Sequence, residues 1–147
     1  MKHLLSLMPA ILLISCVMAG QTASSKSSGV AARHHIIVDL TTVISDGWAL
    51  TLSNVEGLKK NFKDDADIEV VTHGPAVSML HRDDQDFAVR IRKLHEAGVH
   101  FVVGTSTLDS SHATKADMFP FIEYVPSATA EIILKQEAGW SYLKGGY

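Results

Sequence analysis

Strand-like and helix-like segments alternate along most of this 147-residue chain. Compact runs of β-branched and aromatic residues suggest strands at 34–40, 68–72, 99–103, 122–125 and 140–143. Between them apolar residues recur every three or four positions, as at Leu52, Val55 and Leu58, which is typical of helices with one buried face. Parallel strands need crossover connections, so this alternation predicts a mostly parallel sheet with helices on both faces. Handedness and packing rules favour a doubly wound, flavodoxin-like α/β sandwich.

Capping residues set several of the expected helix boundaries. The Asp83-Asp84 pair can cap a helix that ends before Gly98, a residue suited to the position after a helix. Thr114 and Asp117 have the spacing of a capping box for a brief helix. A last helix is expected from Ser127 towards Gly139.

The first residues have the layout of an export signal. Lys2 precedes an apolar run from Leu4 to Ile14, which is too short to span a bilayer as a mature helix. We predict a signal peptide over 1–19, a polar, Ser-rich tether over 20–32 and one folded α/β domain over 33–147. The protein is therefore expected to be exported, either to the periplasm or to a lipid anchor at the cell envelope.

Two cleavage sites remain open. Leu13-Ile14-Ser15-Cys16 resembles the lipobox of bacterial lipoproteins, in which the cysteine is lipidated and becomes the first residue, so that the signal would span 1–15. Val17-Met18-Ala19 would suit an ordinary signal peptidase, which would discard Cys16. The tether favours the lipid anchor. Because Cys16 is the one cysteine of the chain, neither route leaves a free thiol in the mature domain.

Charge and hydropathy argue against two classes of partner, nucleic acids and the membrane interior. The formal net charge is -3, and no local basic cluster gives a basis for nucleic-acid binding. Beyond the N-terminal run, no stretch is apolar for long enough to span a bilayer. Membrane contact is therefore expected only through the candidate lipid on Cys16.

Polar residues gather where three of the predicted strands end. Ligands of doubly wound folds collect beyond these carboxyl ends, which here carry Asp39, His73-Gly74 and Gly104-Thr105-Ser106. We take these six residues as the candidate ligand pocket. His73 could bind or polarise a small anion, but a structural role in the turn is favoured. The backbone of 105–107 could bind an oxyanion at a helix start or simply turn the chain, and both readings stay open.

Two sharper chemistries are disfavoured. Asp39, His73 and Ser106 could meet as a hydrolase triad, but the chain has no G-x-S-x-G elbow to expose the serine. Asp39, His73 and His112 could hold a metal, yet their spacing fits no recognised ligand pattern. We predict no catalytic residue, metal site or cofactor.

Trp48 suits the core or an interface equally, whereas Trp140 and Tyr142, on the expected edge strand, favour a subunit interface.

Three segments resemble the DsrE-like family. Residues 68–77 (IEVVTHGPAV) resemble its hydrophobic strand followed by His-Gly-Pro. Residues 98–108 (GVHFVVGTSTL) resemble its Gly-Val-x-Phe segment, small loop and Thr-Leu, and residues 125–143 resemble its C-terminal end. The order and spacing of the motifs, more than any one of them, carry the resemblance.

The resemblance implies a fold, an assembly and a departure from the family chemistry. It implies a three-layer sandwich with a parallel five-stranded sheet, usually assembled as a trimer or hexamer, and a link to sulfur relay through a cysteine persulfide. Gly104 stands where that cysteine would be, and glycine cannot form the nucleophilic thiolate. We predict a non-catalytic, homo-oligomeric envelope protein that binds a small ligand or a partner in sulfur metabolism. The alternatives are an enzyme that uses the strand-end cluster, or a hetero-oligomer in which a cysteine-bearing homologue supplies the thiol.

Overall fold

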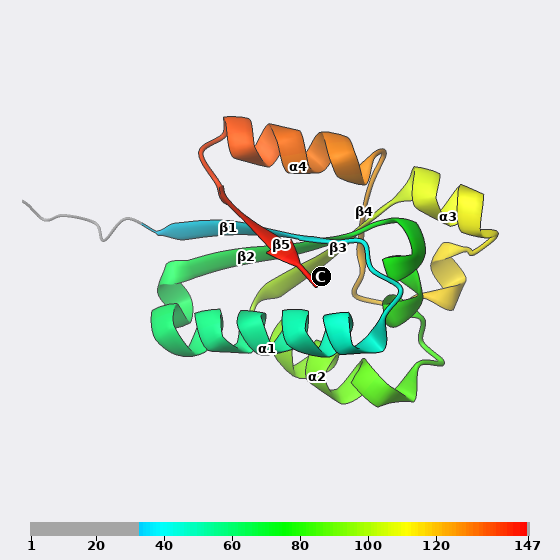
Figure 1. Ribbon diagram of the computed structural model, residues 1–147, viewed down its shortest axis with the longest axis horizontal. Coiled ribbons are helices and arrows are strands. Elements are labelled where there is room, and N and C mark those ends of the chain that lie inside the picture. Colours follow the sequence, from blue (N-terminus) through cyan, green and yellow to red (C-terminus); the bar gives the residue numbers. More distant parts are fainter. Residues whose placement is uncertain (1–32, 147) are drawn as a thin grey trace, which may run out of the picture.

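The computed structural model describes residues 33–146 (Figure 1). The predicted signal peptide, the tether and Cys16 lie outside these residues. In chain order the main elements are β1 (His34–Leu40), α1 (Ser45–Phe62), β2 (Ala66–Thr72), α2 (Gln85–Glu96), β3 (Val99–Gly104), α3 (Thr105–Ser111), β4 (Glu123–Val125), α4 (Ala128–Glu137) and β5 (Ser141–Gly145). Short 3-10 helices complete the described part, namely η1 (Lys63–Asp65), η2 (Gly74–Leu80) and η3 (Lys115–Asp117).

The strands form one parallel five-stranded sheet in the order β4-β3-β2-β1-β5. The chain moves outward from β1 to β4, and α4 then carries it back to place β5 on the free side of β1. This arrangement confirms the predicted α/β sandwich with a parallel sheet. It also confirms the last predicted strand, since β5 pairs with β1 from Ile36↔Ser141 to Leu40↔Gly145.

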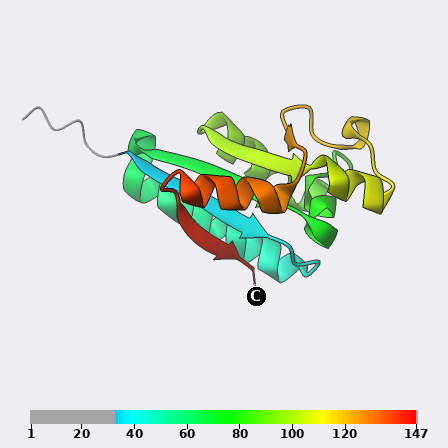
Figure 2. The ribbon, with the colours of Figure 1, turned by 90° about the horizontal axis from the view of Figure 1, so that it is seen from above.

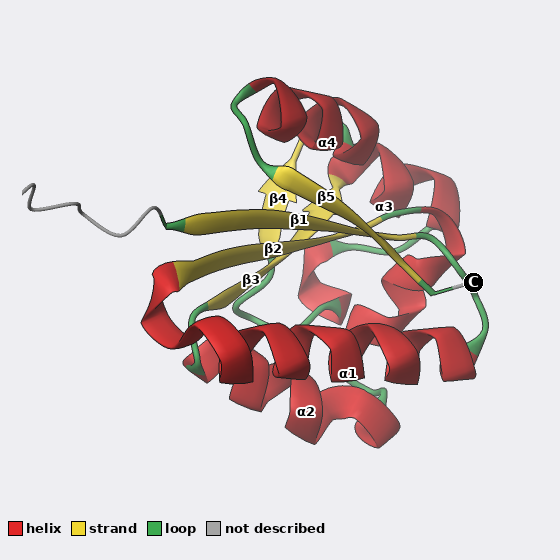
Figure 3. Ribbon diagram, turned by 60° about the vertical axis from the view of Figure 1, so that its left-hand side comes forward, coloured by secondary structure: helices red, strands yellow, loops and turns green. Residues whose placement is uncertain are grey.

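The two faces of the sheet bury unequal cores. Successive side chains of a strand point to opposite faces, so in β1 Ile36 and Val38 join the larger core with α1 and α2, while Ile37 points to α4. The core under α4 holds far fewer buried residues, Ile37, Val71, Val102, Ala128 and Ile132. Figures 1 and 3 show α1 and α2 together below the sheet and α4 above it.

Most of the expected helix boundaries are found, and one helix was missed. The Asp84 carboxylate caps α2 by accepting from the Asp86 amide, and Gly98 follows that helix with a φ of +84°. The capping box of Thr114 and Asp117 is present at η3. The segment TSTLDSS, which forms α3, has low intrinsic helix propensity, so local pattern gave no more than a helix start at 105. Burial of Leu108 against the larger core stabilises this helix instead.

The structure places Trp48 in the core. Its side chain is 8% exposed, its Nε1 donates to the Thr42 carbonyl over 2.7 Å, and its ring meets the ring of Phe87 edge to face. Trp140 instead packs against the smaller core, with the Lys135 ammonium 4.1 Å from its ring centre. Subunit contacts by Trp140 and Tyr142 stay a prediction. Within residues 33–146, no helix is both long and apolar enough to cross a membrane.

Candidate functional site

Asp39 and His73 meet at the carboxyl end of the sheet, as expected from their positions near the end of β1 and directly after β2. His73 Nε2 lies 2.8 Å from Asp39 Oδ1. The other carboxylate oxygen, Oδ2, accepts a 2.8 Å hydrogen bond from the Tyr142 hydroxyl of the edge strand β5. Three neighbouring segments of the sheet are therefore tied together through one carboxylate.

Within this cluster, both oxygens of the Asp39 carboxylate have a partner, His73 for Oδ1 and Tyr142 for Oδ2. The hydrogen bond to Asp39 raises the pKa of the Tyr142 phenol, and partial burial adds to the rise in pKa. The His73 amide donates to the Leu40 carbonyl over 3.1 Å, which fixes the backbone beside the imidazole. With both Asp39 oxygens engaged, the arrangement orients the ring of His73 and leaves its Nδ1 as the nitrogen with which a ligand could interact.

Gly104 ends β3 at the point where α4 begins. A Cβ atom built on Gly104 would lie 2.7 Å from the backbone nitrogen of Ala128 and 3.2 Å from its Cβ. Real Cβ atoms essentially never approach a neighbour within 3.0 Å, and a backbone nitrogen cannot swing aside as a side chain can. The position therefore requires glycine for a packing reason, independent of any chemistry.

Thr105 and Ser106 begin α3, and both donate hydrogen bonds to the Pro126 carbonyl. The Thr105 hydroxyl and the Ser106 amide both approach this oxygen at 3.5 Å. No hydrogen bond among residues 33–146 joins Ser106 to His73, so the hydrolase triad is not assembled. The metal alternative also fails to assemble in this part of the chain, where no three His, Cys, Asp or Glu side chains are grouped to hold an ion.

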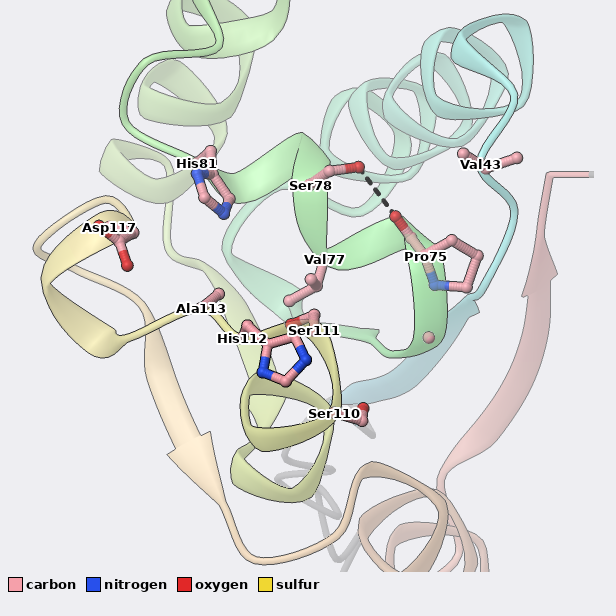
Figure 4. Close-up of a pocket in the computed structure, with 11 residues that line it drawn as sticks. Val43, Pro75, Val77, Ser78, His81, Ser110, Ser111, His112, Ala113 and Asp117 are labelled. Carbon is pink, nitrogen blue, oxygen red and sulfur yellow. Dashed lines mark hydrogen bonds between the residues drawn. The ribbon is translucent and has the colours of Figure 1, made fainter.

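One cavity lies beside the predicted pocket rather than in it. It has a volume of about 580 Å³ and opens between η2, the C-terminal end of α3 and η3 (Figure 4). Of the six residues predicted to bind ligand, Gly74 alone lines it; His112, the rejected metal ligand, lines it too. His81 also lines the cavity and was not singled out from the sequence, whereas Asp117 was noted there only as a helix-capping residue.

The sequence offered little signal for this cavity. Its walls come from a 3-10 helix and from a short helix that local pattern did not predict, and both are placed by long-range packing. The capping box at Thr114 and Asp117 was the one usable sign, because it marks a defined turn with a fixed carboxylate. Hydrogen bonds from Thr114 lower the pKa of Asp117, so this carboxylate stays charged.

A buried ion pair lies between α4 and the sheet, away from the cavity. Glu69 of β2 is 6% exposed and bonds through Oε2 to the Lys135 ammonium, while its Oε1 is buried with no hydrogen-bond partner among the described residues. Burial raises the pKa of Glu69 despite this pairing. For Lys135 burial is the largest single influence and disfavours the charged form, but the hydrogen bonds and charges of Glu69 and Glu131 together outweigh it and raise the pKa of Lys135. The pair therefore fixes α4 on the sheet at an electrostatic cost.

Comparisons with known proteins agree with the fold. The model of the DsrE/DsrF-like family matches residues 40–144. Among solved structures, the protein of unknown function MTH1491 from Methanobacterium thermoautotrophicum is 25% identical, with a TM-score of 0.72 over 76% of this chain and 98% of that one. The ychN protein from E. coli is 13% identical, with a TM-score of 0.64 over 76% and 98% of the two chains, which shows a shared fold. No protein with a curated description matches the sequence.

Proposed function

The chain belongs to the DsrE/DsrF-like family, and from this premise we propose that it serves sulfur metabolism by binding a small ligand or a partner protein, without carrying sulfur on a thiol of its own. A persulfide carrier needs a cysteine whose thiolate can attack a sulfur donor. Residues 33–146 contain no cysteine. We take Gly104 as the position of the family's sulfur-carrying cysteine, as the resemblance implies.

The packing of Gly104 carries the proposal. The contact with the Ala128 nitrogen leaves no space for a Cβ atom, so the backbone around β3 and α4 excludes any side chain there. The hydroxyls of Thr105 and Ser106 do not replace a thiol, because a hydroxyl needs an activating base and no hydrogen bond in the described part supplies one. Binding, rather than sulfur transfer, is then the role that the domain retains.

Assembly and location complete the proposal. The side of α4 that faces away from the sheet exposes Ile133 and Leu134, which are 51% and 58% exposed. Unpartnered apolar residues on a helix surface are typical of an interface, so they support a homo-oligomer, with a trimer or hexamer as the family would imply. We further propose that the mature protein acts in the cell envelope, with Cys16 as the lipid attachment site.

Persulfide transfer tests this function directly. The mature domain is incubated with a low-molecular-weight persulfide donor, and the intact protein is examined by mass spectrometry for a covalent sulfur adduct. We expect none. The positive control is Ser106→Cys, which puts an accessible thiol on the exposed start of α3 and should take up sulfur. Sulfur uptake or turnover by the cysteine-free domain would overturn the proposal.

The Asp39–His73 contact favours a second candidate, an enzyme that uses the strand-end cluster. A carboxylate 2.8 Å from an imidazole can orient it as a general base. His73→Ala should then abolish an activity while leaving the free energy of unfolding nearly unchanged. If the variant only lowers stability, the histidine is structural and the binding role stands.

The remaining alternative is a hetero-oligomer with a cysteine-bearing partner. Native mass spectrometry of the protein from its own envelope fraction would reveal such a partner in stoichiometric amount.

A further inference from the structure

The cavity beside η2 has a chemical character of its own. It is separate from the closed contact at Gly104, since its walls are η2, the far end of α3 and η3 (Figure 4). Its apolar surface includes Val43, Pro75, Val77 and Ala113. A volume of about 580 Å³ falls within the range of small-molecule sites. The class of ligand that fits the cavity depends on which polar atoms of its wall are still available for hydrogen bonds.

The hydroxyl groups of the cavity wall have already used their protons. Ser78 donates to the Pro75 carbonyl over 2.8 Å. Ser110 donates to the Thr107 carbonyl over 2.9 Å, and Ser111 donates to the same carbonyl over 2.8 Å. A hydroxyl has one proton and two lone pairs, so each oxygen can still accept but not donate. The hydroxyls of the wall therefore present acceptors to any ligand.

Asp117 and the last turn of α3 add further acceptors to the wall. Asp117 caps Thr114 through Oδ2, which leaves Oδ1 free to accept. Ser110 and Ser111 form the last turn of α3, where the backbone carbonyls have no donor within the helix. The ring nitrogens of His81 and His112 also line the cavity, and each donates or accepts according to whether it carries a proton. No lysine or arginine of the described chain lines the cavity, although Arg82 lies near Asp117.

We propose that this cavity binds a small organic ammonium ion, with the N–H donors directed to Asp117 Oδ1 and the serine oxygens and a short apolar body against Val77 and Pro75. An ammonium group has three donors and no acceptor, which complements the serine oxygens and the Asp117 carboxylate. Its charge pairs with the one carboxylate of the wall. A carboxylate or phosphate ligand would be repelled by the Asp117 carboxylate and by the serine lone pairs, so it is disfavoured. The inference deepens the proposed binding role and rests on it.

Three probes of equal length test the ligand class. n-Butylammonium, n-butanol and n-butyrate are titrated separately into the mature domain, and backbone NMR shifts are followed at Val77 and Ala113. We expect saturable shifts at these positions with n-butylammonium. The affinity for n-butanol should be at least about tenfold weaker, since the charge-assisted hydrogen bonds are lost. Butyrate should give no saturable shift at the cavity.

Matched variants test the site. Asp117→Asn keeps an oxygen for the Thr114 cap but removes the charge, and it should weaken n-butylammonium binding about tenfold. Ser110→Lys places a competing ammonium at the cavity and should abolish binding. Asp65→Asn and Thr129→Lys make the same charge changes at exposed positions elsewhere and should leave the affinity unchanged.

The outcomes separate this inference from the proposed function. Equal or tighter binding of n-butyrate, unchanged affinity in Asp117→Asn, or shifts that map away from the cavity would each overturn the ammonium site. None of these results would bear on sulfur transfer. Conversely, sulfur uptake by the cysteine-free domain would overturn the proposed function and leave the binding data at the cavity intact.

Discussion

Gly104→Ala tests whether the close contact between β3 and α4 requires glycine. The added Cβ would lie 2.7 Å from the Ala128 nitrogen and 3.2 Å from the Ala128 Cβ, so the start of α4 must move. Forcing an extra methyl group into a packed site costs about 1–3 kcal/mol. Movement of the helix start also weakens the cap in which Ser127 accepts from the Ala130 amide over 3.3 Å, a contribution of about 1 kcal/mol. We expect a total loss of about 3 kcal/mol.

Gly57→Ala is the matched control. Gly57 lies within α1, and a Cβ built there meets nothing within 4 Å. Alanine is favoured over glycine in a helix by about 0.5–1 kcal/mol, so this variant should be slightly more stable than the parent. The same chemical change is thus expected to have opposite signs at the two positions.

Urea unfolding followed by circular dichroism measures both variants. Gly104→Ala should lower the midpoint with an unchanged slope, because the extent of surface exposed on unfolding stays the same. A domain of this size should lose roughly 10–15 °C in Tm for about 3 kcal/mol. A Gly104→Ala protein as stable as the parent, with α4 unmoved, would refute the argument from packing and with it the main support for the proposed function.

Three further predictions concern the polar clusters. Asp39→Asn should lower the pKa of the Tyr142 phenol, because the hydrogen bond to the carboxylate is the main cause of its raised value; NMR titration of the tyrosine ring measures it. Lys135→Met leaves a buried carboxylate unpaired and should cost about 3 kcal/mol at pH 7 in urea unfolding, against less than about 1 kcal/mol for the surface control Arg90→Met. The raised pKa of Glu69 means that the folded state binds the proton of this carboxyl more tightly than the unfolded state does. The free energy of unfolding relative to Glu69→Gln should therefore be greatest below pH 4.5 and fall as the pH rises through the folded pKa. A relative stability that rises over this range would contradict the prediction.

Local pattern predicted the elements whose signals lie within a few residues. Gly98 after α2 and the capping box at Thr114 and Asp117 are such signals, and both were found. The α3 helix escaped because TSTLDSS has no helical preference of its own and depends on the burial of Leu108. Local sequence gives the intrinsic preference of a segment for helix or strand, whereas long-range packing decides which structure a segment with a weak preference adopts.

The candidate site was predictable to the same extent. Asp39 and His73 lie at the carboxyl ends of adjacent parallel strands, and the rule for carboxyl ends brings them together without further information. Tyr142 joins them only because β5 returns beside β1, a pairing across more than 100 residues of chain that no local pattern reveals. The cavity depends on η2, α3 and η3 together, so its residues could not be assembled before the fold was known.

The close approach of β3 to the start of α4 predicts how a cysteine at position 104 would behave. In Gly104→Cys the new side chain would stand in a buried position against the start of α4, with no path to solvent unless the helix moves. Thiol reactivity requires access and a stabilised thiolate, and burial in apolar surroundings removes both. With a charged alkylating reagent, Gly104→Cys should therefore react at least about tenfold more slowly than Ser106→Cys, whose position is exposed, and urea should abolish the difference. Equal rates in the folded state would mean that α4 yields readily at this point, and that a single substitution separates this protein from a sulfur carrier.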